Sequence, residues 1–196
     1  MKKIIFILVI SILLMSQSSA VKTEPVTKEI IAAFESDLAV FFESSETGDW
    51  DTYLDLTYPG LFEIAPKEAL VAQFEQIEAM GISLTIGNME IQDTSDMAAY
   101  GNEWFVKIDY SADMEIKLSK ELESMYELFC SQFEQQYSGG EIEKTPPNKL
   151  LIKNADASML AVSSDRKIWK YLEISEEGEQ IMSVIIPEPV YDYFFE

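Results

Sequence analysis

The sequence contains no histidine and a single cysteine, Cys130. Without histidine the chain has no Ser-His-Asp or Cys-His catalytic group, no histidine-ligated zinc and no side chain whose ordinary pKa lies near neutrality. A lone cysteine also excludes cysteine-rich zinc and iron–sulfur sites, and it leaves no partner for a disulfide within the chain. Because Cys130 lies at helical spacing from Tyr126 and Phe133, we expect it to be a small buried hydrophobe.

Basic residues are scarce as well. Lys and Arg number 14 against 35 Asp and Glu, which gives a net charge of −21. Such a chain repels phosphate backbones and anionic lipid, so we expect neither nucleic acid nor a membrane surface among its partners. A glycine-rich nucleotide loop is missing, because Gly139-Gly140 follows a predicted helix instead of preceding one. We therefore expect no cofactor.

Long apolar runs are also rare, and the one that stands out spans residues 4–15. It follows Lys2-Lys3 and precedes Ser18-Ser19-Ala20, which is the arrangement of a cleaved secretory signal peptide. At about 12 residues the run is shorter than the ~20 that a membrane span needs, although a retained anchor is the alternative. We expect residues 1–20 to be removed as a signal peptide. Residues 21–196 would then be exported to the periplasm or the extracellular space as a single domain without a membrane anchor.

Three helices are predicted in the first third of the expected mature chain. Thr27 can cap a helix in which apolar side chains recur at three- and four-residue steps. Gly48 ends that helix, and Asp49 caps a short second one. Pro66 suits the first turn of a third helix. Residues 21–26 are predicted to form a loose leader.

Period-two patterns follow. Apolar side chains occupy the even positions of residues 104–118 and mostly charged ones the odd positions, which predicts a long strand with one solvent-facing side. Residues 82–91 alternate more weakly. A fourth helix is predicted over residues 119–137 and a loop over residues 141–148. Short antiparallel strands are predicted at residues 150–153, 159–163, 167–174 and 180–186, followed by an aromatic tail at residues 190–195.

Helices followed by an antiparallel sheet are the order of the α+β class. The stretches that mark the particular layout are Phe41-Phe42, Gly48-Asp49-Trp50, Tyr58-Pro59 to Phe62, the Pro66 helix, residues 104–118 and Ile168-Trp169-Lys170-Tyr171-Leu172. Their order resembles the nuclear transport factor two-like superfamily, also called cystatin-like. That resemblance implies N-terminal helices packed on a strongly bent antiparallel sheet, which form a cone with an apolar pocket. The predicted helix at residues 119–137 departs from the simplest members and would cap the sheet or fill the pocket mouth.

Aromatic side chains are the candidate pocket lining. Rings at helix and strand periodicity also suit ordinary core packing, and both interpretations stay open. The candidates for binding an apolar ligand are Trp50, Tyr53, Tyr58, Phe62, Trp104, Tyr110, Trp169 and Tyr171.

Acidic side chains suggest a cation site only weakly. Asp49, Asp51 and Asp55 are close in sequence. A calcium loop begun at Asp49 would need a ligand, a glycine and a glutamate at the positions of Tyr53, Leu54 and Gly60. We therefore expect helix capping and exposed carboxylates, and no metal. A second acidic group, predicted to be a solvated hairpin turn or a docking site for a basic partner, comprises Glu173, Glu176, Glu177 and Glu179.

The expected function is that of a non-catalytic binding or interaction protein, with a small apolar ligand or another protein as partner. The alternative is a small-molecule isomerase or hydrolase that uses a pocket carboxylate with a tyrosine. Asp51 or Glu63 would then act with Tyr53 or Tyr58. Asp109 would serve only if the charged side of its strand lined the cone. A water-reachable pocket that holds a carboxylate of raised pKa near a tyrosine would favour the enzyme.

Overall fold

The computed structural model describes residues 21–137, 141–174 and 179–196. The expected signal peptide lies outside these described residues, as do Gly139-Gly140 and the glutamates Glu176 and Glu177 of the predicted acidic turn. Within the described ranges, no helix is both long and apolar enough to span a membrane.

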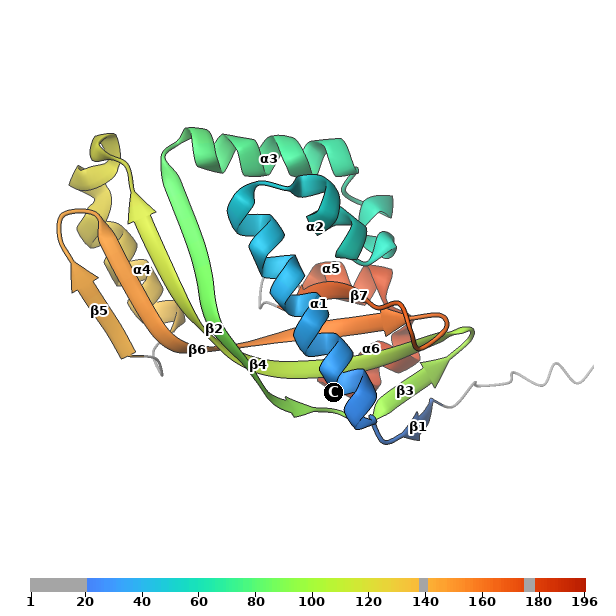
Figure 1. The fold of residues 1–196 in the computed structure, drawn as a ribbon. Helices are drawn as coiled ribbons and strands as arrows, with labels where there is room; N and C mark the ends of the chain where they lie inside the picture. Colours follow the sequence, from blue (N-terminus) through green and yellow to red (C-terminus); the bar gives the residue numbers. More distant parts are fainter. Residues whose placement is uncertain (1–20, 138–140, 175–178) are drawn as a thin grey trace, which may run out of the picture.

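The N-terminal helices begin and end where their caps predict. Thr27 Oγ1 accepts a hydrogen bond from the Ile30 N–H at 3.4 Å, and Gly48 closes the first helix with a left-handed φ of 70°. Asp49 accepts a hydrogen bond from the Thr52 N–H and caps the second helix. In chain order the helices and 3₁₀ turns are α1 (Lys28–Thr47), α2 (Trp50–Leu56), η1 (Pro59–Glu63), α3 (Lys67–Ala79), η2 (Lys120–Met125), α4 (Tyr126–Gln136), α5 (Glu179–Ile185) and α6 (Glu188–Phe195) (Figure 1).

Seven strands in the described part of the chain form one antiparallel sheet around the long pair β4 and β6. On one side, β4 pairs with β2 and with the short β3–β1 arm. On the other side, β6 pairs with β5 at one end and with β7 at the other. The strands are β1 (Lys22–Glu24), β2 (Ile82–Thr94), β3 (Met97–Tyr100), β4 (Glu103–Leu118), β5 (Glu141–Thr145), β6 (Lys149–Ser163) and β7 (Lys170–Ile174).

The sheet bends sharply, as the resemblance implies, and the bend is built from two irregularities beside Asp113 (Figure 1). Pairing shifts register near Gly87 in β2 and opposite Ala112 in β4. Asn88 and Asn154 adopt positive φ of 51° and 48° at these places. The Asp113 carboxylate accepts hydrogen bonds from Asn88 Nδ2 at 2.7 Å and from the Asn154 N–H at 2.9 Å, so one side chain joins both irregular segments.

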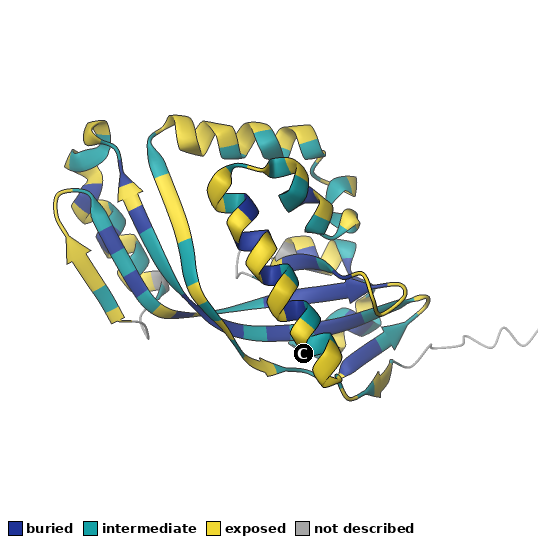
Figure 2. Ribbon diagram, viewed as in Figure 1, coloured by how far each residue is buried: buried dark blue, intermediate teal, exposed yellow. Residues whose placement is uncertain are grey.

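Helices cover both faces of the central strands. α1 lies in the bend of the sheet, with both buried and exposed residues along its length (Figures 1 and 2). Its buried Phe34 and Leu38 belong to the same core cluster as Ile108 of β4. Side chains alternate along a strand, so Phe105 points to the opposite face. There it packs with Leu160 under α5 and α6. The prediction of a solvent-facing side on this strand is therefore wrong at this end, where Phe105 is fully buried.

At the far end of the sheet, α4 packs on β4 and β6. Tyr126 and Cys130 of this helix lie buried against Ile116 and Ile152. Cys130 is thus the buried hydrophobe that its spacing predicts, and the extra helix between strands caps the sheet. A short 3₁₀ turn, η2, replaces the first turn expected of this helix.

The C-terminal predictions need correction. Residues 150–153 and 159–163 are not separate strands but parts of β6, because Asn154 takes the left-handed conformation within the strand and the chain continues without turning. Residues 180–185 are not a strand but belong to α5, and Ile186 follows directly after it. The Ile186 N–H donates to the Met182 carbonyl oxygen at 2.9 Å, and both side chains are buried. The aromatic tail forms α6, with Val190 buried.

Two short strands are also missed by the sequence patterns. β5 lies within the predicted loop of residues 141–148, and the predicted leader contains β1, which pairs with β3. Both are short and largely exposed, so they carry little apolar alternation.

One edge of the sheet is formed by β2, which has no second partner strand in the described part of the chain. α1 lies beside this edge, and Glu46 Oε1 accepts a hydrogen bond from the Ile86 N–H at 2.6 Å. Register shifts between Gly87 and Glu90 and between Ile91 and Asp93 interrupt the same strand.

Candidate functional site

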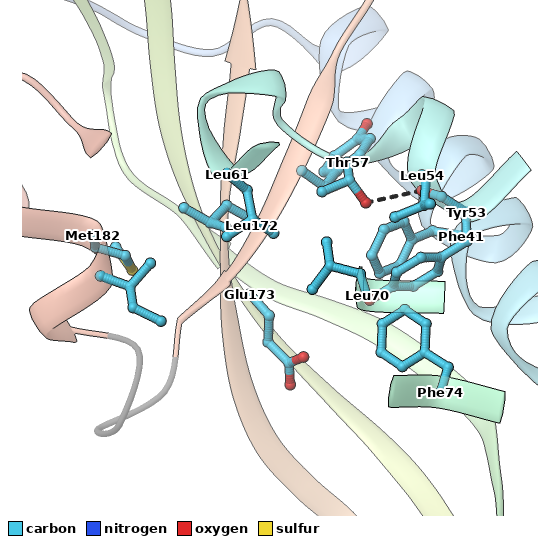
Figure 3. A pocket seen from close by; sticks show the side chains of 12 residues that line it. Phe41, Tyr53, Leu54, Thr57, Leu61, Leu70, Phe74, Leu172, Glu173 and Met182 are labelled. Carbon is cyan, nitrogen blue, oxygen red and sulfur yellow. Dashed lines mark hydrogen bonds between the residues drawn. The ribbon is translucent and has the colours of Figure 1, made fainter. Parts of the chain in front are cut away.

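A pocket of about 190 Å³, here named the β7 pocket, lies along the outer edge of β7 (Figure 3). Its walls come from α1, α2, η1, α3, β7 and α5. Of the lining residues that the structure describes, Glu173 is the only charged one. These residues are Phe41, Tyr53, Leu54, Thr57, Leu61, Leu70, Phe74, Tyr171, Leu172, Glu173, Ile181 and Met182.

The segment after α2 fixes one wall of the pocket against β7. The Tyr58 N–H donates to the Tyr171 carbonyl oxygen at 2.9 Å, and Thr57 forms a parallel bridge with the same residue. Thr57 Oγ1 donates to the Tyr53 carbonyl oxygen at 2.9 Å (Figure 3). Beyond Tyr171 the described chain supplies no strand to the outer edge of β7, and the pocket lies there.

Aromatic rings form the wall on the α2–α3 side. The Tyr53 ring lies 4.3 Å from Phe41 and 5.5 Å from Phe74, measured between ring centroids. Trp50 stacks on Phe74 from behind at 4.6 Å. These contacts hold α3, which buries none of its own residues fully, over the pocket.

Glu173 brings a carboxylate into these apolar surroundings. By accessible area the residue is exposed, so water reaches it, yet the side chains crowded around it desolvate the carboxylate and raise its pKa above the ordinary 4.5. Glu173 is thus reached by water on one side, while the side chains on its other sides raise its pKa. Among the described residues, none makes a hydrogen bond or an ion pair with this carboxylate. Figure 3 shows it pointing into the space between β7 and α3.

Three tyrosine hydroxyls lie near enough to sense this charge. Burial, and secondly the Glu173 carboxylate, raise the pKa of Tyr53, Tyr110 and Tyr137. The hydroxyl of Tyr171 is used elsewhere, since it donates to Asp37 Oδ2 at 2.8 Å. The pocket therefore combines apolar walls, neutral phenols and one carboxylate that gains or loses a proton closer to neutrality than an ordinary glutamate.

The predicted aromatic residues divide into those near the pocket and those away from it. Tyr53 and Tyr171 line it, and Trp50 supports Phe74 from behind. Tyr110 is buried more deeply, with its ring 5.6 Å from Phe42.

The other candidates lie at separate places in the fold. Tyr58 packs in the core under α6, and burial together with the Glu103 carboxylate raises its pKa to about 12. Phe62 lies under the Lys67 ammonium group, 4.8 Å from the ring centroid, and Trp104 lies 3.5 Å under the Arg166 guanidinium. Trp169 is buried in the core against Phe34.

The carboxylates considered for catalysis do not line the β7 pocket. Asp51 and Glu63 are exposed, and Asp109 pairs with Lys107 at 3.2 Å and accepts a hydrogen bond from Ser158. Asp49 caps α2, which holds the pKa of its carboxyl below the ordinary value. Over the described residues, no group of three or more acidic or cysteine side chains is placed to bind a metal ion.

Of the lining residues, only Tyr53 and Tyr171 are among the candidates predicted from the sequence, and Glu173 is the charged one that the prediction misses. The sequence places Glu173 in an acidic turn because other glutamates follow it. A signal was nevertheless present, since Trp169, Tyr171 and Glu173 occupy alternate positions of one predicted strand and so point to one side of it. Phe41, Leu70 and Phe74 carried only the general signal of an apolar helix face.

Comparison with models of known protein families and with curated proteins finds no match to this chain. Among solved structures, the crystal structure of a candidate dehydratase of the NTF2-like family from Streptomyces avermitilis aligns over 74% of this chain and 93% of its own. The two sequences are 12% identical, and the TM-score is 0.39. The family printed for this neighbour is the superfamily that the order of elements resembles.

Proposed function

We propose that the protein binds a small, mostly apolar molecule in the β7 pocket, with Glu173 as its polar anchor. The observation that carries this proposal is an apolar-lined pocket whose single charged group has no partner among the described residues. Ligand sites commonly pair apolar walls with a few polar groups that fix orientation. A dry cavity of about 150 Å³ accepts a benzene-sized molecule, so a ring with a short substituent suits this volume.

The test uses p-cresol as an uncharged probe and two-dimensional NMR of the purified protein. We expect p-cresol to shift the resonances of Tyr53, Phe74 and Met182, which line the pocket. Leu70→Trp places a larger side chain in the pocket and should abolish these shifts, whereas Val40→Trp, at an exposed position of α1, should keep them. Shifts confined to other surfaces, or shifts that survive Leu70→Trp, would reject the proposal.

A second candidate function is acid–base chemistry by Glu173 on a bound molecule. The observation that favours it is a pocket carboxyl of raised pKa that interacts electrostatically with the Tyr53 hydroxyl, because such a carboxyl exchanges protons more readily near neutral pH than an ordinary glutamate. Proton exchange next to the carbonyl of cyclohexanone in D₂O tests it. Exchange above the buffer rate that disappears in Glu173→Gln would support catalysis, and exchange at the buffer rate alone would exclude it for this substrate class.

We also propose that the mature protein acts outside the cytoplasm. Support comes from the basic, apolar and small-residue order of residues 1–20. N-terminal sequencing of the protein from the periplasmic or culture fraction should begin at Val21, and recovery of intact Met1 from the cytoplasm would contradict export.

A further inference from the structure

Within the described ranges the Glu173 carboxylate has no counter-ion, although two lysines lie on the elements around it. Lys67 of α3 pairs with Asp55 at 3.4 Å, and Lys170 of β7 donates to the Asp55 carbonyl oxygen. Both ammonium groups are therefore directed to the end of α2 and not into the β7 pocket. Among the described lining residues no cation is present, and a cationic ligand would supply the charge that balances Glu173.

The walls of the pocket suit such a charge. Phe41, Tyr53 and Phe74 present a continuous group of rings on the side that faces Glu173 (Figure 3). Aromatic faces attract a cation within about 6 Å of the ring, and more strongly where water is displaced. The remaining walls, such as Leu70 and Met182, suit an apolar body.

The negative charge of Glu173 and of the whole chain favours one kind of ligand for the β7 pocket over the others. An anion would meet both Glu173 and a chain of net charge −21. A neutral molecule would leave the carboxylate buried behind it without a partner, which costs free energy. A protonated amine supplies the missing partner and makes a charge-assisted hydrogen bond with it.

We propose that the natural ligand of the β7 pocket is a small amine with an apolar body, whose ammonium group pairs with Glu173 while the body lies against Phe41, Tyr53 and Phe74. This inference rests on the proposed function, because it assigns a chemical class to the molecule bound there.

The pH dependence of amine binding follows from the groups around Glu173. Among the described residues, the titratable groups that interact electrostatically with Glu173 are the hydroxyls of Tyr53, Tyr110 and Tyr137, which stay protonated over pH 5–8 because burial raises their pKa values further. Of these groups, Glu173 is the one that takes up a proton as pH falls, and it does so at a higher pH than an ordinary glutamate because its pKa is raised. Amine binding should weaken as pH falls, since the proton and the ammonium group compete for one carboxylate.

Calorimetric titration with three probes of nearly equal size tests the inference: benzylamine, benzyl alcohol and benzoate. We expect wild-type protein at pH 7.5 to bind benzylamine at least tenfold more tightly than benzyl alcohol and to bind benzoate least. Glu173→Gln should remove the preference for benzylamine while benzyl alcohol still binds. Glu63→Gln removes one negative charge at an exposed position outside the pocket and should keep the preference.

The outcomes separate the two proposals. Equal affinity for benzylamine and benzyl alcohol, or a preference that survives in Glu173→Gln, overturns the amine assignment and leaves the apolar pocket standing. Failure of all three probes to bind at millimolar concentration overturns both the amine assignment and the proposed function.

Discussion

Glu173 is placed where its ionised form is disfavoured, so its effect on stability depends on pH. Its folded-state pKa is raised above the ordinary 4.5. The protein without ligand is therefore relatively more stable below pH 4.5, and it loses that increment as pH rises through the folded-state pKa. We expect Glu173→Gln to stabilise the ligand-free protein at pH 7 by roughly 0.5–1 kcal/mol, less than a fully buried unpaired group would give.

Urea denaturation at pH 4, 5.5 and 7 checks this expectation, with Glu63→Gln as the exposed control. The advantage of the Gln variant should shrink towards pH 4. A Gln variant that gains stability only in acid would show that the surroundings of Glu173 favour its charge.

Asp113 has the opposite pH behaviour, because its hydrogen bonds favour the charged form. The bonds from Asn88 and Asn154 hold the pKa of its carboxyl below the ordinary 3.8. Their stabilising contribution is present above pH 3.8 and is lost as pH falls through the folded-state pKa. Asp113→Ala frees both irregular segments and should cost about 1 kcal/mol at pH 7.

Asp156→Ala is the matched control, because it removes an exposed carboxylate from the neighbouring strand β6. It should change the free energy of unfolding by less than about 0.5 kcal/mol. If both variants unfold at the same urea concentration, Asp113 does not hold the bend.

At the level of single elements, α5 offers a direct contrast between helix and strand. In a strand, Met182, Val184 and Ile186 would share one face. In the structure, Met182 of the helix and Ile186 directly after it are buried, whereas Val184 is 72% exposed. We expect Met182→Ala to cost about 2–4 kcal/mol and Val184→Ala less than about 0.5 kcal/mol, as measured by thermal or urea unfolding. Similar losses in the two variants would restore the strand assignment.

The sequence predicts the N-terminal elements well because each carries more than one signal. Around Gly48 and Asp49, a helix stop, a helix cap and a change in apolar spacing coincide, and the structure places the α1–α2 boundary there. Residues 181–186, before Pro187, have no comparable set of signals. A short, mostly apolar run is compatible with a buried strand and with a helix. The prediction of a chain reversal at Asn154 is wrong for another reason. An Asn at positive φ occurs both in turns and in strand irregularities, and the sequence does not distinguish the two.

The candidate site was only partly predictable, because pockets depend on which surfaces meet. Local spacing placed Tyr53 and Tyr171 on inward faces, and both line the β7 pocket. It could not show that the segment near Thr57 bridges to β7 and leaves the rest of that edge open. Without that bridge, Glu173 resembles any glutamate near a turn.

The whole molecule carries a large excess of negative charge. The 14 Lys and Arg balance only part of the 35 Asp and Glu, which leaves the net charge of −21. Repulsion among the remaining carboxylates opposes the compact state, and salt screens it as the Debye length falls from roughly 30 Å at 10 mM to about 8 Å at 150 mM.

We therefore expect the melting temperature at pH 7 to rise between 10 and 150 mM NaCl. Circular dichroism measures it, and the same series near the sequence pI of about 4.2 is the control in which the rise should vanish. A melting temperature that falls with salt at pH 7 would mean that attractive pairs outweigh repulsion.

The protected edge of β2 has a consequence for how this protein behaves when many copies meet. An open strand edge is a template on which another chain can add its own strand, and repetition of that step builds fibrils. Here the Ile86 N–H already donates a hydrogen bond to Glu46 Oε1. Two register shifts in β2 also break the regular spacing that an incoming strand would need. The same carboxylate adds charge that repels a second copy. β2 is therefore a poor seed for fibril growth, even though it is one of the longest strands of the described chain.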